Sequence, residues 1–195
     1  MFSHKALATA ALAGVLILPL AACGSPQEKA AEESAESASE SSSSVFESVS
    51  SSASENVDFA GRATVAGVFE IESSKLAIER TKKADLKAFA QKMVTDHTKA
   101  GTELKAAITA AGLTPPTEGL DSEHQAMLDD LKNASAEDFD SKYIDAQQKA
   151  HDKTIDLFEK ESKDGQAGPV KDFATKTLPA LQAHKAEIQK LDDKY

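Results

Sequence analysis

The chain has 195 residues and a formal net charge of −10, with 32 acidic against 22 basic residues. An acidic chain without a cluster of Lys and Arg is a poor ligand for nucleic acid, so we expect no nucleic-acid partner. A single cysteine excludes an intrachain disulfide. The chain lacks Trp, and Ala, Glu, Lys and Leu are abundant, a composition that favours helices.

Residues 1–22 are typical of an export signal. After Lys5, the run from Ala6 to Ala22 is apolar and uncharged. It ends in Leu20-Ala21-Ala22-Cys23, which resembles a bacterial lipobox with Cys23 as the lipidated residue. The alternative is an uncleaved signal anchor, for which the run of about 17 residues is short. By the same resemblance, Gly24 after the cysteine implies sorting to the outer membrane, and we expect a lipoprotein that faces the periplasm. A signal-anchored or secreted protein is the alternative.

Residues 23–56 form the expected link between the lipid and a folded domain. The stretch 25–56 is rich in Ser, Glu and Ala, and Val45, Phe46 and Val49 are its only large apolar side chains. Such a segment buries too little surface to offset its ordering entropy, so we predict a disordered tether. A short helix docked through Val45–Val49 is the alternative.

Residues 57–195, with a net charge of −5, are predicted to form one helical domain. No stretch shows sustained strand alternation, and Gly112 and Pro169 mark a helix end and a helix start. The expected helices cover about 57–80, 84–111, 121–133, 135–163 and 169–191. The four long helices form two hairpins, and the short one lies in the connection between them. This pattern predicts an all-α four-helix bundle with one long crossover that carries a short extra helix.

The candidate site lies on the inner faces of the four long helices. His97 falls on the stripe of Leu86, Ala90, Met93, Leu104 and Ile108, where a core leucine is expected. Three further inward residues belong with it: Glu70, His151 and His184. The inner face of the helix that carries His151 also presents Phe139, Asp140, Tyr143, Ile144, Gln147, Ile155 and Phe158.

The four residues are predicted to lie at one level of the bundle. Glu70 is about 12 residues before the first hairpin turn and His97 about 14 after it, roughly 18 and 21 Å at 1.5 Å per residue. His151 and His184 are about 15 and 17 residues from the second turn, by the same helical rise. One inward side chain from each helix therefore converges near mid-bundle.

A carboxylate and three neutral imidazoles match the ligand preferences of Zn²⁺, Cu²⁺ or Fe²⁺. We therefore predict one divalent transition metal held by Glu70, His97, His151 and His184. The alternative is a buried polar network, in which the same groups are joined by Asp140, Tyr143 and water. No helix carries a Glu-x-x-His pair, the signature of di-iron carboxylate bundles, so a mononuclear site fits better.

Several neighbours have weaker assignments. Asp96 is rotated about 100° from His97 on a helix and is placed as a hydrogen-bond partner of an imidazole rather than as a ligand, with a solvent-exposed carboxylate as the alternative. Asp140 has the same expected role, or it complements a helix start. Met93 is interpreted as a core residue in preference to a soft copper ligand. His124 lies in the crossover and is expected to miss the bundle centre.

The motifs together resemble the bacterial domain-of-unknown-function family 4142. The resemblance rests on Phe69-Glu70-Ile71-Glu72, on the segment Phe89–His97, on Phe139-Asp140 with Tyr143, Gln147 and His151, and on Leu178-Pro179-Ala180-Leu181 with His184. It implies an exported or outer-membrane protein with a ferritin-like helical fold. Carried across, it points to Glu70, Asp96, His97, Asp140, His151 and His184, and it implies no activity.

These observations predict a membrane-tethered bacterial envelope lipoprotein that binds one transition-metal ion for sequestration, sensing or stress protection. Two alternatives stay open. One is a mononuclear metal redox enzyme that acts on O₂ or peroxide. The other is a metal-free structural or interaction lipoprotein with a polar core. The sequence has no H-E-x-x-H, G-x-S-x-G, P-loop or C-x-x-C motif that would name an enzyme class.

Overall fold

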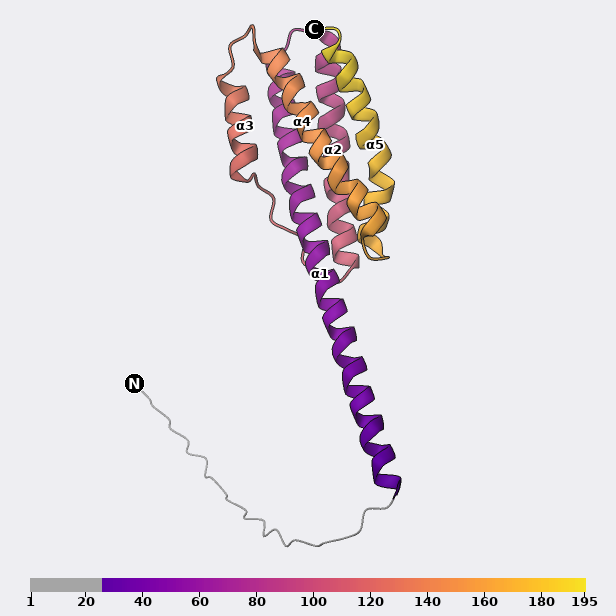
Figure 1. The fold of residues 1–195 in the computed structure, drawn as a ribbon. Coiled ribbons are helices and arrows are strands. Elements are labelled where there is room, and N and C mark those ends of the chain that lie inside the picture. Colours follow the sequence, from indigo (N-terminus) through magenta and orange to yellow (C-terminus); the bar gives the residue numbers. More distant parts are fainter. Residues whose placement is uncertain (1–25) are drawn as a thin grey trace, which may run out of the picture. The chain divides into compact units, whose positions relative to one another are not determined.

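The computed structural model describes residues 26–195, so the expected signal and Cys23 lie outside the described residues. The described chain contains five helices and no strand (Figure 1). They are α1 (Pro26–Arg80), α2 (Ala84–Ala110), α3 (Ser122–Asn133), α4 (Phe139–Asp164) and α5 (Pro169–Asp192). The chain divides into two units, Met1–Ser44 and Val45–Tyr195, and the candidate site belongs to the second.

Within the unit Val45–Tyr195, the long helices form the predicted bundle. α1 and α2 make one antiparallel hairpin, α4 and α5 make the other, and α3 lies in the crossover that returns the chain from the end of α2 to the start of α4 (Figure 1). As a result α2 and α4 run in the same direction, as in ferritin-like bundles. The all-α bundle with one long crossover and an extra short helix is confirmed.

Local sequence explains where the helices begin and end. Gly112 has a φ of 75°, a left-handed conformation that glycine adopts without strain, and the Leu113 N–H donates to the Ile108 carbonyl to close α2. The Asp121 side chain accepts from the His124 N–H and so caps α3. Pro169 occupies the first turn of α5, where its missing N–H has no helical partner in any case.

Two boundaries differ from the sequence prediction. α1 begins at Pro26 instead of near Val57, so it runs through the described part of the segment 25–56 for which the sequence predicts a disordered tether. Ala and Glu are strong helix formers, and no Gly or Pro interrupts the chain between Pro26 and Gly61. α4 begins at Phe139 instead of near Ser135, because Ser135 forms a turn in which its hydroxyl accepts from the Asp138 N–H.

The apolar core falls into two clusters along the bundle. One contains Phe69, Leu86, Phe89, Met93, Tyr143 and Ile188, and the other contains Phe59, Leu104, Ile108, Phe158, Phe173 and Leu181. On α2, His97 lies between Met93 of the first cluster and Leu104 of the second. The predicted polar site therefore interrupts the core partway along the bundle. Among the helices of residues 26–195, none is both long and apolar enough to cross a membrane.

Candidate metal centre

Glu70 joins three of the four long helices at the site. Its side chain is fully buried on α1, with one carboxylate oxygen, Oε2, 2.7 Å from Nδ1 of His97 on α2. The other oxygen, Oε1, lies 3.3 Å from Nδ1 of His151 on α4. The Nδ1 atom of His151 also lies 3.0 Å from the Gln147 carbonyl oxygen one turn earlier on the same helix. Both imidazoles are thus held through Nδ1.

His184 on α5 completes the set through a different carboxylate. Its Nε2 atom lies 2.9 Å from Oδ2 of Asp96, which precedes His97 on α2. His184 itself is buried, whereas the Asp96 side chain is 40% exposed. Asp96 therefore contacts a histidine on α5 and not its neighbour His97, because adjacent side chains on a helix point about 100° apart.

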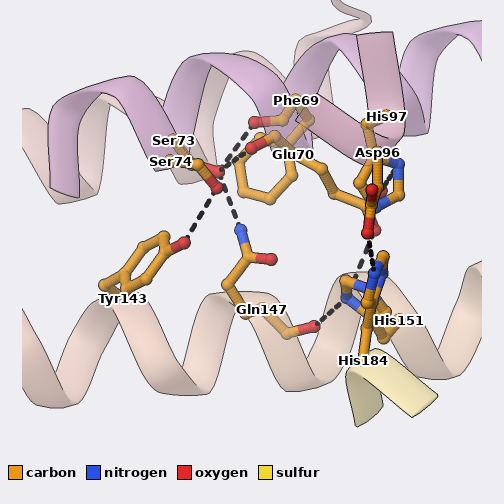
Figure 2. Close-up of polar contacts among 10 residues, drawn as sticks. All are labelled: Phe69, Glu70, Ser73, Ser74, Asp96, His97, Tyr143, Gln147, His151 and His184. Atoms are coloured by element: carbon orange, nitrogen blue, oxygen red, sulfur yellow. Dashed lines mark hydrogen bonds and ion pairs between the residues drawn. The ribbon is translucent and has the colours of Figure 1, made fainter. Parts of the chain in front are cut away.

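The three imidazoles face one another across the bundle axis (Figure 2). Their ring centroids are 5.4 to 5.7 Å apart in every pairing. One ring nitrogen from each can be chosen so that all three lie within 4.8 Å of one another. Nε2 of His97, Nε2 of His151 and Nδ1 of His184 are buried and have no hydrogen-bond partner. Each histidine thus has one nitrogen facing an oxygen and one left free.

The pKa of the Glu70 carboxyl is set by two opposing effects. Burial alone would raise it, but the positive charges that the imidazoles of His97, His151 and His184 carry in acid, together with the contact to His97, outweigh burial and lower the pKa to about 2. The carboxylate is therefore ionised throughout the physiological range. It supplies a fixed negative charge inside the bundle, next to two Nδ1 atoms.

The pKa values of His151 and His184 are lowered from the usual range. Burial is the main cause for both, since a charged imidazolium is poorly solvated inside the bundle. Glu70 opposes this shift at His151, and the hydrogen bond to Asp96 opposes it at His184. Near neutral pH these two imidazoles are uncharged, which is the form that binds metal ions.

A second chain of polar contacts lies beside the histidines and ties α1 to α4 (Figure 2). The hydroxyl groups of Tyr143 and Ser74 are 2.8 Å apart, and the Gln147 amide donates to the Ser73 hydroxyl at 2.9 Å. Because the Gln147 carbonyl also faces His151, this chain fixes the backbone that presents that imidazole. Burial is the main cause of the raised pKa of the Tyr143 hydroxyl, which therefore stays protonated.

Three residues considered from the sequence, Asp140, Tyr143 and His124, lie away from the cluster. Asp140 is in the first turn of α4, with Oδ2 3.7 Å from Nζ of Lys83, and no contact with a histidine is found for it. Tyr143 binds Ser74 instead of an imidazole. His124 pairs with Asp121 and packs its ring against Phe69, with centroids 5.4 Å apart. Asp140 and Tyr143 therefore contact groups other than the imidazoles in the described part of the chain.

Glu70 meets the histidines as predicted, but its contacts differ from those of a simple fourth ligand. Both oxygens face Nδ1 atoms, and the group of residues able to share one ion consists of His97, His151 and His184. In metal sites, a carboxylate that accepts from the ring nitrogen opposite the metal orients the imidazole and raises its basicity. The contacts of Glu70 correspond to this role. Gln147 and the two serines were not assigned to the site from sequence, since none of them is a typical ligand.

The fold and the buried cluster define a class of protein: a ferritin-like four-helix bundle with three histidines and a carboxylate at its centre. The chain belongs to the family described as Domain of unknown function (DUF4142), which matches residues 28–191. A comparison with solved structures finds a similar fold in a DUF305 fragment from Deinococcus radiodurans, with a TM-score of 0.64 and 13% sequence identity. The match covers 72% of this chain and 97% of that one. No curated protein matches the sequence.

Proposed function

We propose that the bundle binds one divalent transition-metal ion, Zn²⁺, Cu²⁺ or Fe²⁺, through His97, His151 and His184. One observation carries this proposal: each of the three imidazoles has one nitrogen facing an oxygen and a second nitrogen that is buried without a partner. A buried polar atom without a hydrogen bond costs about 1–3 kcal/mol, so three such atoms at one place favour a shared ligand.

The dimensions of the cluster support a metal ion as that ligand. Zn–N bonds of about 2.0–2.1 Å place two tetrahedral ligand atoms about 3.3 Å apart. Nitrogens that already lie within 4.8 Å of one another reach this separation by small rotations of the rings. Three protein ligands leave a fourth position for water or another donor, as in open zinc sites. The donors available in the bundle at this level are nitrogen and oxygen, a set that suits all three metals.

Glu70 and Asp96 have a supporting role in this proposal. Glu70 faces Nδ1 of His97 and of His151, and Asp96 faces Nε2 of His184, so every imidazole is oriented by a carboxylate. With the proton held on that side, the opposite nitrogen presents its lone pair to the ion. In this proposal the ion is held for sequestration, for sensing or for protection of the cell envelope against stress. These roles need one bound ion and no assigned reaction.

Metal titration of the purified full chain tests this proposal. After treatment with a chelator, the protein should take up close to one Zn²⁺, Cu²⁺ or anaerobic Fe²⁺ per chain, and its thermal midpoint should rise on binding. His97→Ala and His151→Ala should abolish both effects. His124→Ala is the matched control, because that histidine pairs with Asp121 outside the cluster. A wild-type chain that binds none of the three ions would contradict the proposal.

We propose further that the protein is a lipoprotein held at the bacterial outer membrane through lipid on Cys23. The support is the sequence alone: an apolar run ends at the only cysteine in the chain. Several acyl chains on one residue anchor a protein firmly, whereas a single chain is marginal. Mass spectrometry of the membrane-extracted protein should find a lipid-modified N-terminal cysteine, and Cys23→Ser should release the protein from the membrane. An unmodified Cys23 in the membrane fraction would contradict this.

A further inference from the structure

A cavity of about 480 Å³ opens beside the histidine cluster. It enters the bundle at the seam between α1 and α2, and all four long helices contribute to its wall. His97 and Glu70 both line it, so the cavity reaches the proposed metal site. Its volume lies within the range of about 300–1,000 Å³ that is usual for sites that bind small organic molecules.

Two glycines inside helices keep this cavity open. Gly67 on α1 and Gly101 on α2 both line it, and a Cβ atom added at either one would meet no atom within 4 Å. Glycine inside a helix costs about 1 kcal/mol relative to alanine. Close helix packing does not require glycine at these positions, because the space in front of them is empty. The cavity, and not the packing of the bundle, accounts for the two glycines.

The inner end of the cavity presents one buried polar atom that has no partner. The Glu70 side chain is fully buried, and its two oxygens face Nδ1 of His97 and Nδ1 of His151. His97 is 5% exposed, and its Nε2 atom, one of the proposed metal-binding nitrogens, has no partner. A molecule in the cavity therefore reaches the metal site from the side of His97.

The walls and the mouth restrict the chemistry of the occupant. The deep part of the wall includes the buried apolar side chains of Leu104, Phe158, Phe173 and Leu181. The charges at the rim cancel, because Lys75 pairs with Glu72 at 2.8 Å and Lys105 pairs with Glu118 at 2.6 Å. A balanced rim attracts neither sign of charge, so the rim and the apolar wall favour a molecule whose body is uncharged and apolar.

We propose that this cavity binds a small organic molecule that has an uncharged, apolar body and one nitrogen or oxygen donor, and that the donor occupies the fourth position of the metal ion. This inference rests on the proposed metal site. It adds that the site is open to an external ligand from the α1/α2 seam, and that Gly67 and Gly101 keep the entrance free.

Optical titration of the Co²⁺-loaded full chain tests the inference, with imidazole and 4-phenylimidazole as probes. Both carry the same donor, and only the second has an apolar body. Both should shift the visible cobalt bands without removing the ion. 4-Phenylimidazole should bind about tenfold or more tightly than imidazole, because its phenyl ring is buried against apolar walls. In Gly67→Leu and Gly101→Leu this ratio should fall towards one while Co²⁺ affinity is retained.

Gly61→Leu is the matched control. Gly61 also lies inside α1, is also half-buried, and has open space in front of it, but it lines a different pocket. This variant should keep the wild-type ratio. A Co²⁺-loaded wild-type chain that binds both probes equally, or neither, overturns the inference and leaves the metal site standing. Retention of the full ratio in both filled variants also overturns it. A wild-type chain that takes up none of Co²⁺, Zn²⁺, Cu²⁺ and Fe²⁺ overturns the metal site as well.

Discussion

Glu70→Gln should change the acid stability of the metal-free protein. The Glu70 carboxyl has a folded-state pKa of about 2, against 4.5 for an unperturbed group. A lowered folded-state pKa means that ionised Glu70 contributes stability above pH 4.5, and that this contribution is lost as the pH falls through 4.5 towards 2. The difference of about 2.5 pH units corresponds to about 3 kcal/mol, because one unit is about 1.4 kcal/mol.

The assay is urea unfolding of the chelator-treated full chain, followed by circular dichroism at several pH values between 2 and 6. As the pH is lowered from 6 to 2, the free energy of unfolding of wild type minus that of Glu70→Gln should decrease by about 3 kcal/mol. Glu72→Gln is the control, because Glu72 lies on the same helix, is 45% exposed and pairs only with Lys75. A wild-type minus Glu70→Gln difference that is constant with pH would refute the reasoning.

Three further predictions concern the surroundings of the site. Asp96→Ala removes the oxygen that holds His184 and should weaken metal binding by about 10–100-fold without abolishing it, as measured by competition with a chelator; unchanged affinity would show that Asp96 does not orient the imidazole. Tyr143→Phe leaves the buried Ser74 hydroxyl without this partner and should lower the free energy of unfolding by about 1–2 kcal/mol, with unchanged metal affinity; a loss of metal would place Tyr143 in the site after all. Gly112→Ala should lower the unfolding free energy by about 1–2 kcal/mol in a urea titration, because φ is 75° there, and a neutral effect would contradict this.

The convergence of the site could be predicted because it depends on counting. Helical rise and distance from the hairpin turns place Glu70, His97, His151 and His184 at one level, and apolar periodicity turns them inward. The structure brings all four together. The same arithmetic excludes Asp140, which precedes His151 by 11 residues and so lies about 16 Å from it along the helix. The expected contact between Asp140 and an imidazole rested only on the position of Asp140 on the inner face of its helix.

The direction of each ring could not be read from the sequence. Whether Glu70 faces a metal-binding nitrogen or the opposite one depends on side-chain rotamers, which the position on the helix does not determine. The partner of Asp96 depends on the side of α2 against which α5 packs, since Asp96 is rotated about 100° from His97. Gln147 was placed on the inner face, but its part in holding His151 is played by its backbone carbonyl, which no residue pattern identifies.

The helical extent of α1 shows the limit of composition as a guide. The segment 25–56 has few apolar side chains, which predicts disorder. It also has many Ala and Glu residues and no internal glycine or proline after Pro26, which favours a helix. The structure extends α1 through this segment from Pro26. Low burial of apolar surface and local helix propensity are separate properties, and here they point in opposite directions.

X-ray absorption spectroscopy of the metal-loaded full chain tests the central claim most directly. Three imidazole nitrogens at about 2.0–2.1 Å, with at most one or two further light-atom donors, are expected for zinc held by His97, His151 and His184. A sulfur donor would instead implicate Met93, the buried residue one turn from His97. A spectrum with sulfur, or with fewer than three imidazoles, would contradict the proposed site.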